Sequence, residues 1–303
     1  MTYKQFKMSD AMFRQFRDFI YDKCGVNLVP AKKTMLIARL SKRLRTLGMP
    51  SFQEYFDFVG SSNGRSDELV SMIDAVTTNK TDFFREPHHF DFLTAAALPE
   101  LVRSGRGLSS GRINIWSAGC SSGEEPYTLA MVLSEFCQAR GNGAFSILAT
   151  DISTRVLAVA QRGIYHEKMV EPVPQQLKRK YLMRGKGTRE GSCRVVPELR
   201  KCIRFRRLNL IEGHNFGLSM GMDIIFCRNV IIYFDRKTQI KLFEKFYNQL
   251  KPGGYLFIGH SETLHGINDQ FVPVGSAVYQ KIVEQGSSRV GEYSNKRFDN
   301  LTT

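Results

Sequence analysis

The chain has 303 residues, 42% of them apolar, so it can bury a sizeable core, and its length suggests about two domains. Its 43 Lys and Arg against 29 Asp and Glu give a formal net charge of +14, which favours an acidic partner. Six cysteines without a C-x-x-C pair, and no run of about 18 apolar residues, exclude a disulfide scaffold, a zinc ribbon and a membrane span. The N-terminus lacks an apolar secretory segment, so we expect a cytoplasmic protein with reduced thiols.

The first 76 residues predict a small all-helical domain. Helical spacing of apolar residues, N-cap residues and stop glycines indicate four helices, at 9–25, 30–48, 51–59 and 66–76. The second helix has an apolar stripe on one side. Its other face is strongly basic and carries Lys32, Lys33, Arg39, Lys42, Arg43 and Arg45.

Positive charge is concentrated in two segments. Residues 1–50 hold 11 Lys and Arg against 3 Asp, a net +8, and residues 162–207 hold 14 against 4 Glu, a net +10. The remainder of the chain sums to −4. A single charge run is usually a solvated face, but two such concentrations in an otherwise slightly acidic chain favour binding surfaces.

From about residue 110, short apolar runs alternate with helical periods, which predicts an α/β domain on a mostly parallel sheet. The expected strands are Ile113–Trp116, Phe145–Ala149, Ile203–Leu208, Met222–Phe226 and Tyr255–Ile258. The expected helices are Glu124–Arg140, Ser153–Arg162 and Arg236–Leu250. The Gly-rich, basic stretch 163–207 interrupts the alternation and is interpreted as a small hairpin insertion. The polar, aperiodic residues 285–303 predict a disordered tail.

The first strand of this domain leads into a glycine turn, Ser117 to Gly123, and a helix opens at Glu124-Glu125-Pro126. A strand, a Gly-rich turn and a helix N-terminus form a nucleotide-type pocket at the carboxyl edge of a parallel sheet. Two glutamates in the first helical turn would repel phosphate and suit a cationic ligand. The alternative is an ordinary turn whose acidic residues only stabilise the helix.

Two further polar residues follow strands. Asp151 ends the second strand, where it can accept hydrogen bonds from ribose hydroxyls or simply cap the next helix. Asn209 follows another strand and is placed to read an adenine edge. Together these features favour an adenosine that carries positive charge, and S-adenosylmethionine fits.

Five segments of the chain resemble the CheR family, the chemoreceptor glutamate methyltransferases of bacterial chemotaxis. They are TTNKTDFFRE at 77–86, WSAGCSSGEEPY at 116–127, ATD at 149–151, FCRNVIIYFD at 226–235 and GHSE at 259–262. The resemblance implies a small N-terminal all-α domain followed by a Rossmann-like class I SAM-dependent methyltransferase domain with a small inserted antiparallel β subdomain. The implied divisions are a helical docking domain at 1–76, a linker and helix with part of the active site at 77–109, the methyltransferase domain at 110–284 with the insertion at 163–207, and the tail at 285–303.

The resemblance also implies roles for individual residues. Asn79, Thr81 and Arg85 would contact the cofactor, and Arg85 would lie at the methyl-transfer centre, which Tyr233 would face as the second catalytic residue. Glu125 and Asp151 would hold the methionine and ribose ends of the cofactor. The remaining cofactor contacts would come from Asn209, Leu210, Arg228 and Asn229.

A protein-glutamate O-methyltransferase is thus implied, which moves the methyl group of S-adenosylmethionine to glutamates of methyl-accepting chemoreceptors for adaptation and leaves S-adenosylhomocysteine. The acidic receptor helices would dock on the basic helix, through Lys33, Arg39, Lys42, Arg43 and Arg45. In some members the β subdomain binds a pentapeptide at the receptor's C-terminus. We expect a monomer, recruited to membrane-bound receptor arrays without inserting into the membrane.

This chemistry agrees with what the sequence lacks. A glutamate carboxylate is ionised at neutral pH, so its attack on a sulfonium methyl group needs no general base, and no Cys–His or Ser–His–Asp set is required.

Three alternative functions compete with this interpretation. A nucleic-acid methyltransferase would also carry basic patches, but Arg228-Asn229-Val230-Ile231 stands where such enzymes have N/D-P-P-Y/F, so no nucleic-acid partner is expected. A non-catalytic SAM-binding signalling module would not need Arg85 and Tyr233. No metal site is expected from His88, His89, His260 or His265, because the adjacent His88 and His89 would point to different sides of a helix and His260 lies in a loop with Glu262.

Overall fold

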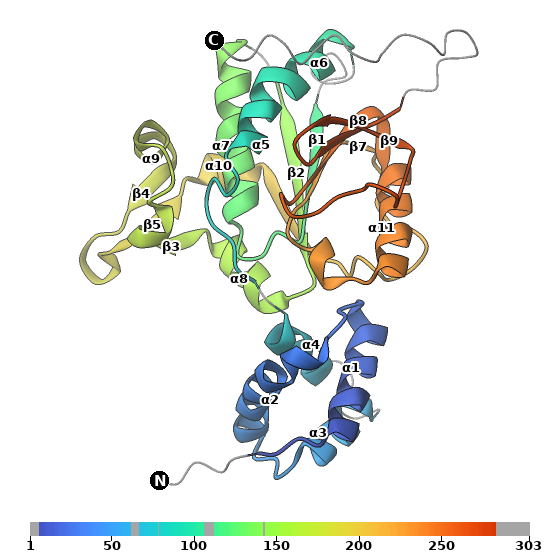
Figure 1. The fold of residues 1–303 in the computed structure, drawn as a ribbon. Coiled ribbons are helices and arrows are strands. Elements are labelled where there is room, and N and C mark those ends of the chain that lie inside the picture. The colour runs from blue at the N-terminus through green and yellow to red at the C-terminus, as the bar shows by residue number, and fades with distance from the viewer. Residues whose placement is uncertain (1–5, 62–66, 78, 106–111, 142, 283–303) are drawn as a thin grey trace.

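The computed structural model describes residues 6–61, 67–77, 79–105, 112–141 and 143–282. The tail expected at 285–303 therefore lies outside the described residues. Figure 1 shows a helical N-terminal unit below a larger unit built around a twisted sheet, with a small separate sheet projecting to one side.

The N-terminal unit contains the four predicted helices, α1 (Asp10–Cys24), α2 (Lys33–Leu47), α3 (Phe52–Gly60) and α4 (Asp67–Val76), with a 3₁₀ turn at Pro30–Lys32 before α2. The Ser9 hydroxyl caps α1 by accepting from the amide of Met12. Gly25 ends α1 with φ 72°, a conformation that glycine adopts most easily. The apolar stripes of the helices meet in one core, in which Phe16, Ile20, Leu36, Leu40 and Tyr55 are fully buried.

The main sheet has seven strands in the order β6-β2-β1-β7-β8-β10-β9. The strands are β1 (Ile113–Ala118), β2 (Phe145–Asp151), β6 (Ile203–Arg207), β7 (Met222–Cys227), β8 (Leu250–Ile258), β9 (Phe271–Gly275) and β10 (Val278–Lys281). β6, β2, β1, β7 and β8 are parallel, and β10 pairs antiparallel with both β8 and β9. The chain leaves the central strand β1 toward β2 and later returns on its other side as β7. Ligands bind at such a switch point, outside the carboxyl ends of the strands.

Helices cover both faces of the sheet. One face packs against α5 (His88–Phe92), a π-helical turn (Leu93–Ala97), α6 (Leu98–Arg103), α7 (Glu124–Ala139) and α8 (Thr154–Arg162). The other face packs against α11 (Arg236–Gln249). On the first face the Phe90 ring stacks on Phe226, with ring centroids 6.1 Å apart, and on the second Trp116 packs edge-on against Phe246.

The predicted strands and helices are present, with two differences at the end of the chain. β8 begins at Leu250, five residues before the expected start, because the segment Lys251 to Gly254 continues the strand and α11 stops at Gln249. β9 and β10 were not predicted. Both are short strands with partly exposed side chains. β9 lies at the edge of the sheet and contains Pro273, and neither strand has the apolar run of a central strand.

The insertion has more strands than the expected hairpin but spans fewer residues. It is a three-stranded antiparallel sheet in the order β3-β5-β4, formed by β3 (Ile164–His166), β4 (Leu182–Arg184) and β5 (Ser192–Val195), with α9 (Gln175–Tyr181) beside it. The helix α10 (Pro197–Lys201) then leads to β6. Because β6 pairs in parallel with β2 in the main sheet, the predicted insertion limit at 207 is wrong.

Candidate functional site

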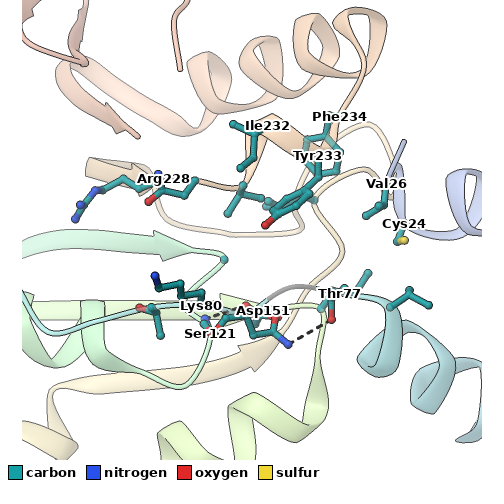
Figure 2. Close-up of a pocket in the computed structure, with 18 of the residues that line it drawn as sticks. Cys24, Val26, Thr77, Lys80, Ser121, Asp151, Arg228, Ile232, Tyr233 and Phe234 are labelled. Atoms are coloured by element: carbon teal, nitrogen blue, oxygen red, sulfur yellow. Dashed lines mark hydrogen bonds between the residues drawn. The ribbon is translucent and has the colours of Figure 1, made fainter. Parts of the chain in front are cut away.

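A cavity of about 370 Å³ lies between the N-terminal unit and the carboxyl ends of the central strands. Figure 2 shows Tyr233 and Asp151 facing one another across it. All ten residues predicted for catalysis or cofactor binding line this cavity, although they come from five separate segments: Asn79, Thr81, Arg85, Glu125, Asp151, Asn209, Leu210, Arg228, Asn229 and Tyr233.

The N-terminal unit is joined to the catalytic unit by hydrogen bonds beside the cavity. The Tyr21 hydroxyl donates to Asp235 at 2.8 Å, and the amide of Asn27 donates to the carbonyl of Tyr233 at 2.8 Å. The N-terminal unit therefore forms one wall of the site and fixes the backbone of Tyr233.

The glycine turn after β1 brings bare backbone to the cavity. Gly119 has φ 83°, and a Cβ atom on it would collide with the side chain of Val230. Gly123 has φ 100°, and a Cβ atom there would lie 2.8 Å from Ala160 and from the Tyr165 hydroxyl. Only glycine fits these two positions without rearrangement.

The two glutamates of the following helix have different environments. Glu125 lines the cavity, where its Oε1 accepts from the Ser117 hydroxyl at 2.7 Å and its Oε2 lies 3.4 Å from Nη1 of Arg228. Burial raises the pKa of Glu125, and the Arg228 charge opposes that rise. Glu124 is instead buried beside the Ser122 hydroxyl, and burial raises its pKa to about 7. Only one of the two therefore faces a ligand in the cavity.

Asp151 fixes the two loops that end β1 and β2. Its Oδ2 accepts from the amide of Ser121 and its Oδ1 from the amide of Ser153, each at 2.9 Å. The hydroxyl of Ser153, not Asp151, caps α8. Burial raises the pKa of Asp151, and the bonds from the two amides oppose the rise.

The segment from Asn79 to Glu86 crosses the cavity as a loop. The carbonyl of Asn79 accepts from the Ser121 hydroxyl at 2.9 Å, and Nη1 of Arg85 donates to the carbonyl of Lys80 at 3.0 Å. Phe84 and Glu86 have φ 54° and 55°, which is rare for residues with a side chain and persists only where the surroundings hold the backbone.

An ion pair between Arg228 and Glu86 holds this loop in place. Nη2 of Arg228 lies 3.1 Å from Oε2 of Glu86 and donates to the carbonyl of Arg85 at 2.5 Å. The side-chain amide of Asn229 donates to Oε1 of Glu86 at 3.3 Å. Burial alone would raise the pKa of Glu86, but Arg228 and Asn229 outweigh it and lower that pKa. Glu86 was not predicted as a site residue, although its place beside Arg85 in the 77–86 segment was an indication.

Glu262 was also missed, although it lies in the GHSE segment. Its Oε2 accepts from the amides of Gly259 and Asn229 at 2.6 and 3.0 Å, and its Oε1 accepts from the amide of Ile232 at 3.2 Å. The buried carboxylate thus joins the loops that follow β7 and β8. It supports Asn229, which has φ 58°, and the turn that presents Tyr233.

Asn209 lines the cavity, but its amide is already bonded to protein groups. Nδ2 donates to the carbonyl of Lys23 at 2.8 Å, and Oδ1 accepts from the amide of Ile211 at 3.3 Å. The side chain predicted to read an adenine edge is thus engaged with α1 of the N-terminal unit.

The predicted docking residues of α2 do not all face outward. Arg43 pairs with the buried Glu68, and Arg39 donates to the carbonyls of Val76 and Thr77, so both are half-buried. Lys33 pairs with Asp10 at 2.6 Å. The exposed cations of this region are Lys32, Lys42 and Arg45. The expectation that Arg39 and Arg43 belong to an outward basic face is therefore corrected.

The histidines also differ from expectation. The rings of His88 and His89 lie against each other with centroids 4.3 Å apart, and ligand atoms of Glu86, His88 and His89 lie within 4.8 Å of one another. However, Glu86 is already paired with Arg228, whose charge would repel a cation. Burial lowers the pKa of His89 to about 4, so its ring is neutral at pH 7.

Comparison with known proteins gives the family. The model described as CheR methyltransferase, SAM binding domain, matches residues 79–280, and the model described as CheR methyltransferase, all-alpha domain, matches residues 11–77. The chain belongs to the CheR methyltransferase family. Its resemblance to this family in the five motif segments is thereby confirmed.

Relatives match this chain along most of their length. A chemotaxis protein methyltransferase of Borreliella burgdorferi is 44% identical over 86% of this chain and 91% of its own. A chemotaxis protein methyltransferase of Escherichia coli is 41% identical over 90% of this chain and 91% of its own. Among solved structures, the N-methyltransferase NodS of Bradyrhizobium japonicum with S-adenosyl-L-homocysteine shows 16% identity and a TM-score of 0.31, covering 63% of this chain and 70% of that one.

Proposed function

We propose that this CheR methyltransferase transfers the methyl group of S-adenosylmethionine to glutamate carboxylates of methyl-accepting chemoreceptors, as a protein-glutamate O-methyltransferase that serves adaptation. One observation carries the proposal. The carboxylates of Glu125 and Asp151 and the bare backbone of Gly119 lie in the same cavity as the side chains of Arg85 and Tyr233. The first set suits a cationic adenosine ligand, and the second suits an anionic substrate.

The cavity residues fit S-adenosylmethionine chemically. Glu125 supplies negative charge for the ammonium and sulfonium groups, and Asp151 offers oxygen acceptors for ribose hydroxyls. Gly119 lines the cavity with bare backbone, and a Cβ atom there would collide with the side chain of Val230. When bound, the cofactor supplies a methyl group on a positively charged sulfur. Asn79, Thr81, Leu210 and Asn229 would complete its contacts.

The chain's own residues then position the substrate. The target carboxylate is ionised at neutral pH, so no side chain has to remove a proton. The Arg85 guanidinium would orient this carboxylate through one oxygen, since a symmetric grip would stabilise the ground state. The Tyr233 hydroxyl, which makes no hydrogen bond within the described residues, would restrain an oxygen of the same group. Holding the two reactants in the right geometry lowers the activation free energy by roughly 7–11 kcal/mol.

The proposed partners are acidic receptor helices and, at the β subdomain, a C-terminal receptor pentapeptide. The exposed Lys32 lines the cavity, and Lys42 and Arg45 are further exposed positive charges along α2. The subdomain leaves β3 and β4 as edges, to which an extended peptide can add. No helix among the described residues is long and apolar enough to cross a membrane. We propose a cytoplasmic monomer that is recruited to receptor arrays.

The test is transfer of label. The full chain is incubated with methyl-labelled S-adenosylmethionine and membranes containing chemoreceptors, and the membranes are then treated with alkali. Release of volatile labelled methanol, lost in Arg85→Ala, supports carboxyl methyl ester formation. Label that appears in added nucleic acid and not in receptors would support the rival nucleic-acid methyltransferase. S-adenosylhomocysteine binding without transfer to either would support a non-catalytic module.

A further inference from the structure

Arg39 lies on α2 among the basic residues, but its contacts are internal. Its Nη1 donates to the carbonyl of Val76 at 2.5 Å and to the carbonyl of Thr77 at 2.9 Å. These carbonyls lie at the C-terminal end of α4, where helical carbonyls have no partner within the helix and carry partial negative charge. A guanidinium satisfies two of them at once and suits the helix dipole.

The bonded carbonyls stand at the entry to the cofactor segment. Thr77 lines the cavity, and its hydroxyl accepts from the Asn79 side-chain amide at 3.4 Å. The carbonyl of Asn79 accepts from the Ser121 hydroxyl in the glycine turn at 2.9 Å. Figure 2 shows the bond to the labelled Thr77 as a dashed line. A shift at Thr77 would therefore displace groups at both sides of the cofactor site.

The same end of α4 is attached to the catalytic unit. Oδ2 of Asp74 accepts from the hydroxyl of Thr154 and from the amide of Arg155, each at 3.2 Å, at the start of α8. That helix begins three residues after Asp151, which lines the cavity. The end of α4 is thus held by α2 on one side and by the cofactor-binding unit on the other.

We propose that Arg39 is a positioning residue for cofactor binding, which fixes the segment 77–81 through the end of α4, and that it is not part of the receptor-docking surface. Charge alone is insufficient for this role, because one nitrogen must reach two adjacent carbonyls from a fixed direction. A lysine offers a compact charge on a flexible stem and replaces this geometry only in part. The inference rests on the proposed function only in taking receptors as the substrate.

The test measures S-adenosylhomocysteine binding calorimetrically with no receptor present, for the wild type, Arg39→Gln, Arg39→Lys and Lys42→Gln. Lys42 is the matched control, since it lies three residues away on the same helix and is exposed. We expect the dissociation constant to rise about tenfold or more in Arg39→Gln, as charge-assisted hydrogen bonds are lost, and by less in Arg39→Lys. Lys42→Gln should bind S-adenosylhomocysteine as the wild type does and raise the KM for receptor.

Receptor binding at saturating S-adenosylhomocysteine separates positioning from docking. Arg39→Gln should retain it and Lys42→Gln should weaken it. The inference is overturned if the Arg39 variants bind S-adenosylhomocysteine as the wild type does, or if they lose receptor affinity alone. If Arg39→Gln does not fold, the affinity of Arg39→Lys for S-adenosylhomocysteine tests the inference. A purely electrostatic role of Arg39 predicts wild-type affinity for this variant, whereas the positioning role predicts a weaker one. Failure of transfer to receptors by the wild type would refute the proposed function and leave this binding result intact.

Discussion

At the scale of single residues, the site depends on side chains whose freedom is limited by their neighbours. Arg85 and Tyr233 line the cavity and are the two groups proposed to hold the anionic substrate. The Arg85 main-chain carbonyl is held by Arg228, and the Tyr233 carbonyl is held by Asn27. The backbones are therefore fixed while the functional ends of both side chains face the cavity.

Tyr233→Phe tests the proposed catalytic hydroxyl. The variant should lower kcat for receptor methylation about tenfold, because one hydrogen bond to a charged carboxylate is lost. The ring and the backbone bond to Asn27 remain, so the affinity for S-adenosylhomocysteine should not change. Steady-state kinetics and calorimetry on the same preparation check both expectations. An unchanged kcat would remove the hydroxyl from the mechanism.

Glu124 predicts a pH dependence of stability. Burial raises its pKa from 4.5 to about 7, so the unfolded chain loses this proton at lower pH than the folded chain does. The stability associated with this carboxyl is fully present below about pH 4.5 and is lost as the pH rises through 7. In Glu124→Gln the loss should be absent. Between pH 4.5 and 7.5, the free energy of unfolding measured with denaturant should rise by about 3 kcal/mol in the variant relative to the wild type. If the free energies of the two proteins change with pH in parallel, the raised pKa of Glu124 is contradicted.

At the scale of elements, the loops after β7 and β8 depend on a single buried carboxylate. Glu262 accepts from three backbone amides, at Gly259, Asn229 and Ile232. Glu262→Ala should lower the free energy of unfolding by about 3 kcal/mol, because buried amides lose a charged acceptor. Glu262→Gln should lose less. Glu244→Ala on α11, an exposed site, is the control and should change stability little.

The helix α2 combines two tasks that its sequence does not separate. Its inward cations hold α4, and its outward cations are proposed to attract an acidic partner. An attraction between exposed charges is screened by salt. The methylation rate should therefore fall as ionic strength rises, and less steeply in Lys42→Gln/Arg45→Gln. The control is Lys201→Gln/Arg204→Gln, which removes exposed cations of α10 and β6 and should retain the wild-type dependence of the rate on salt. If both double variants lose this salt dependence equally, a specific docking role of α2 is contradicted.

At the scale of the whole molecule, local patterns predicted the elements and the segments of the site. Capping serines, stop glycines and apolar spacing depend on neighbours in the chain, so the helices of the N-terminal unit were predictable. The motif segments contain eight of the ten predicted residues that line the cavity, and the other two, Asn209 and Leu210, follow a predicted strand. The inward turn of Arg39, the bond from Asn209 to Lys23 and the short strands β9 and β10 were not predictable. These depend on contacts between distant parts of the chain, which leave no periodic pattern in either partner.

The most direct test of the account is to map the methyl group on the acceptor. Purified receptor cytoplasmic fragments are incubated with S-adenosylmethionine and the full chain, digested at mildly acidic pH and analysed by tandem mass spectrometry. We expect methyl groups on glutamate side chains of acidic helices, and none with Arg85→Ala. Methyl groups on other side chains, or none on a receptor that the protein binds together with S-adenosylhomocysteine, would contradict glutamate methylation by this site.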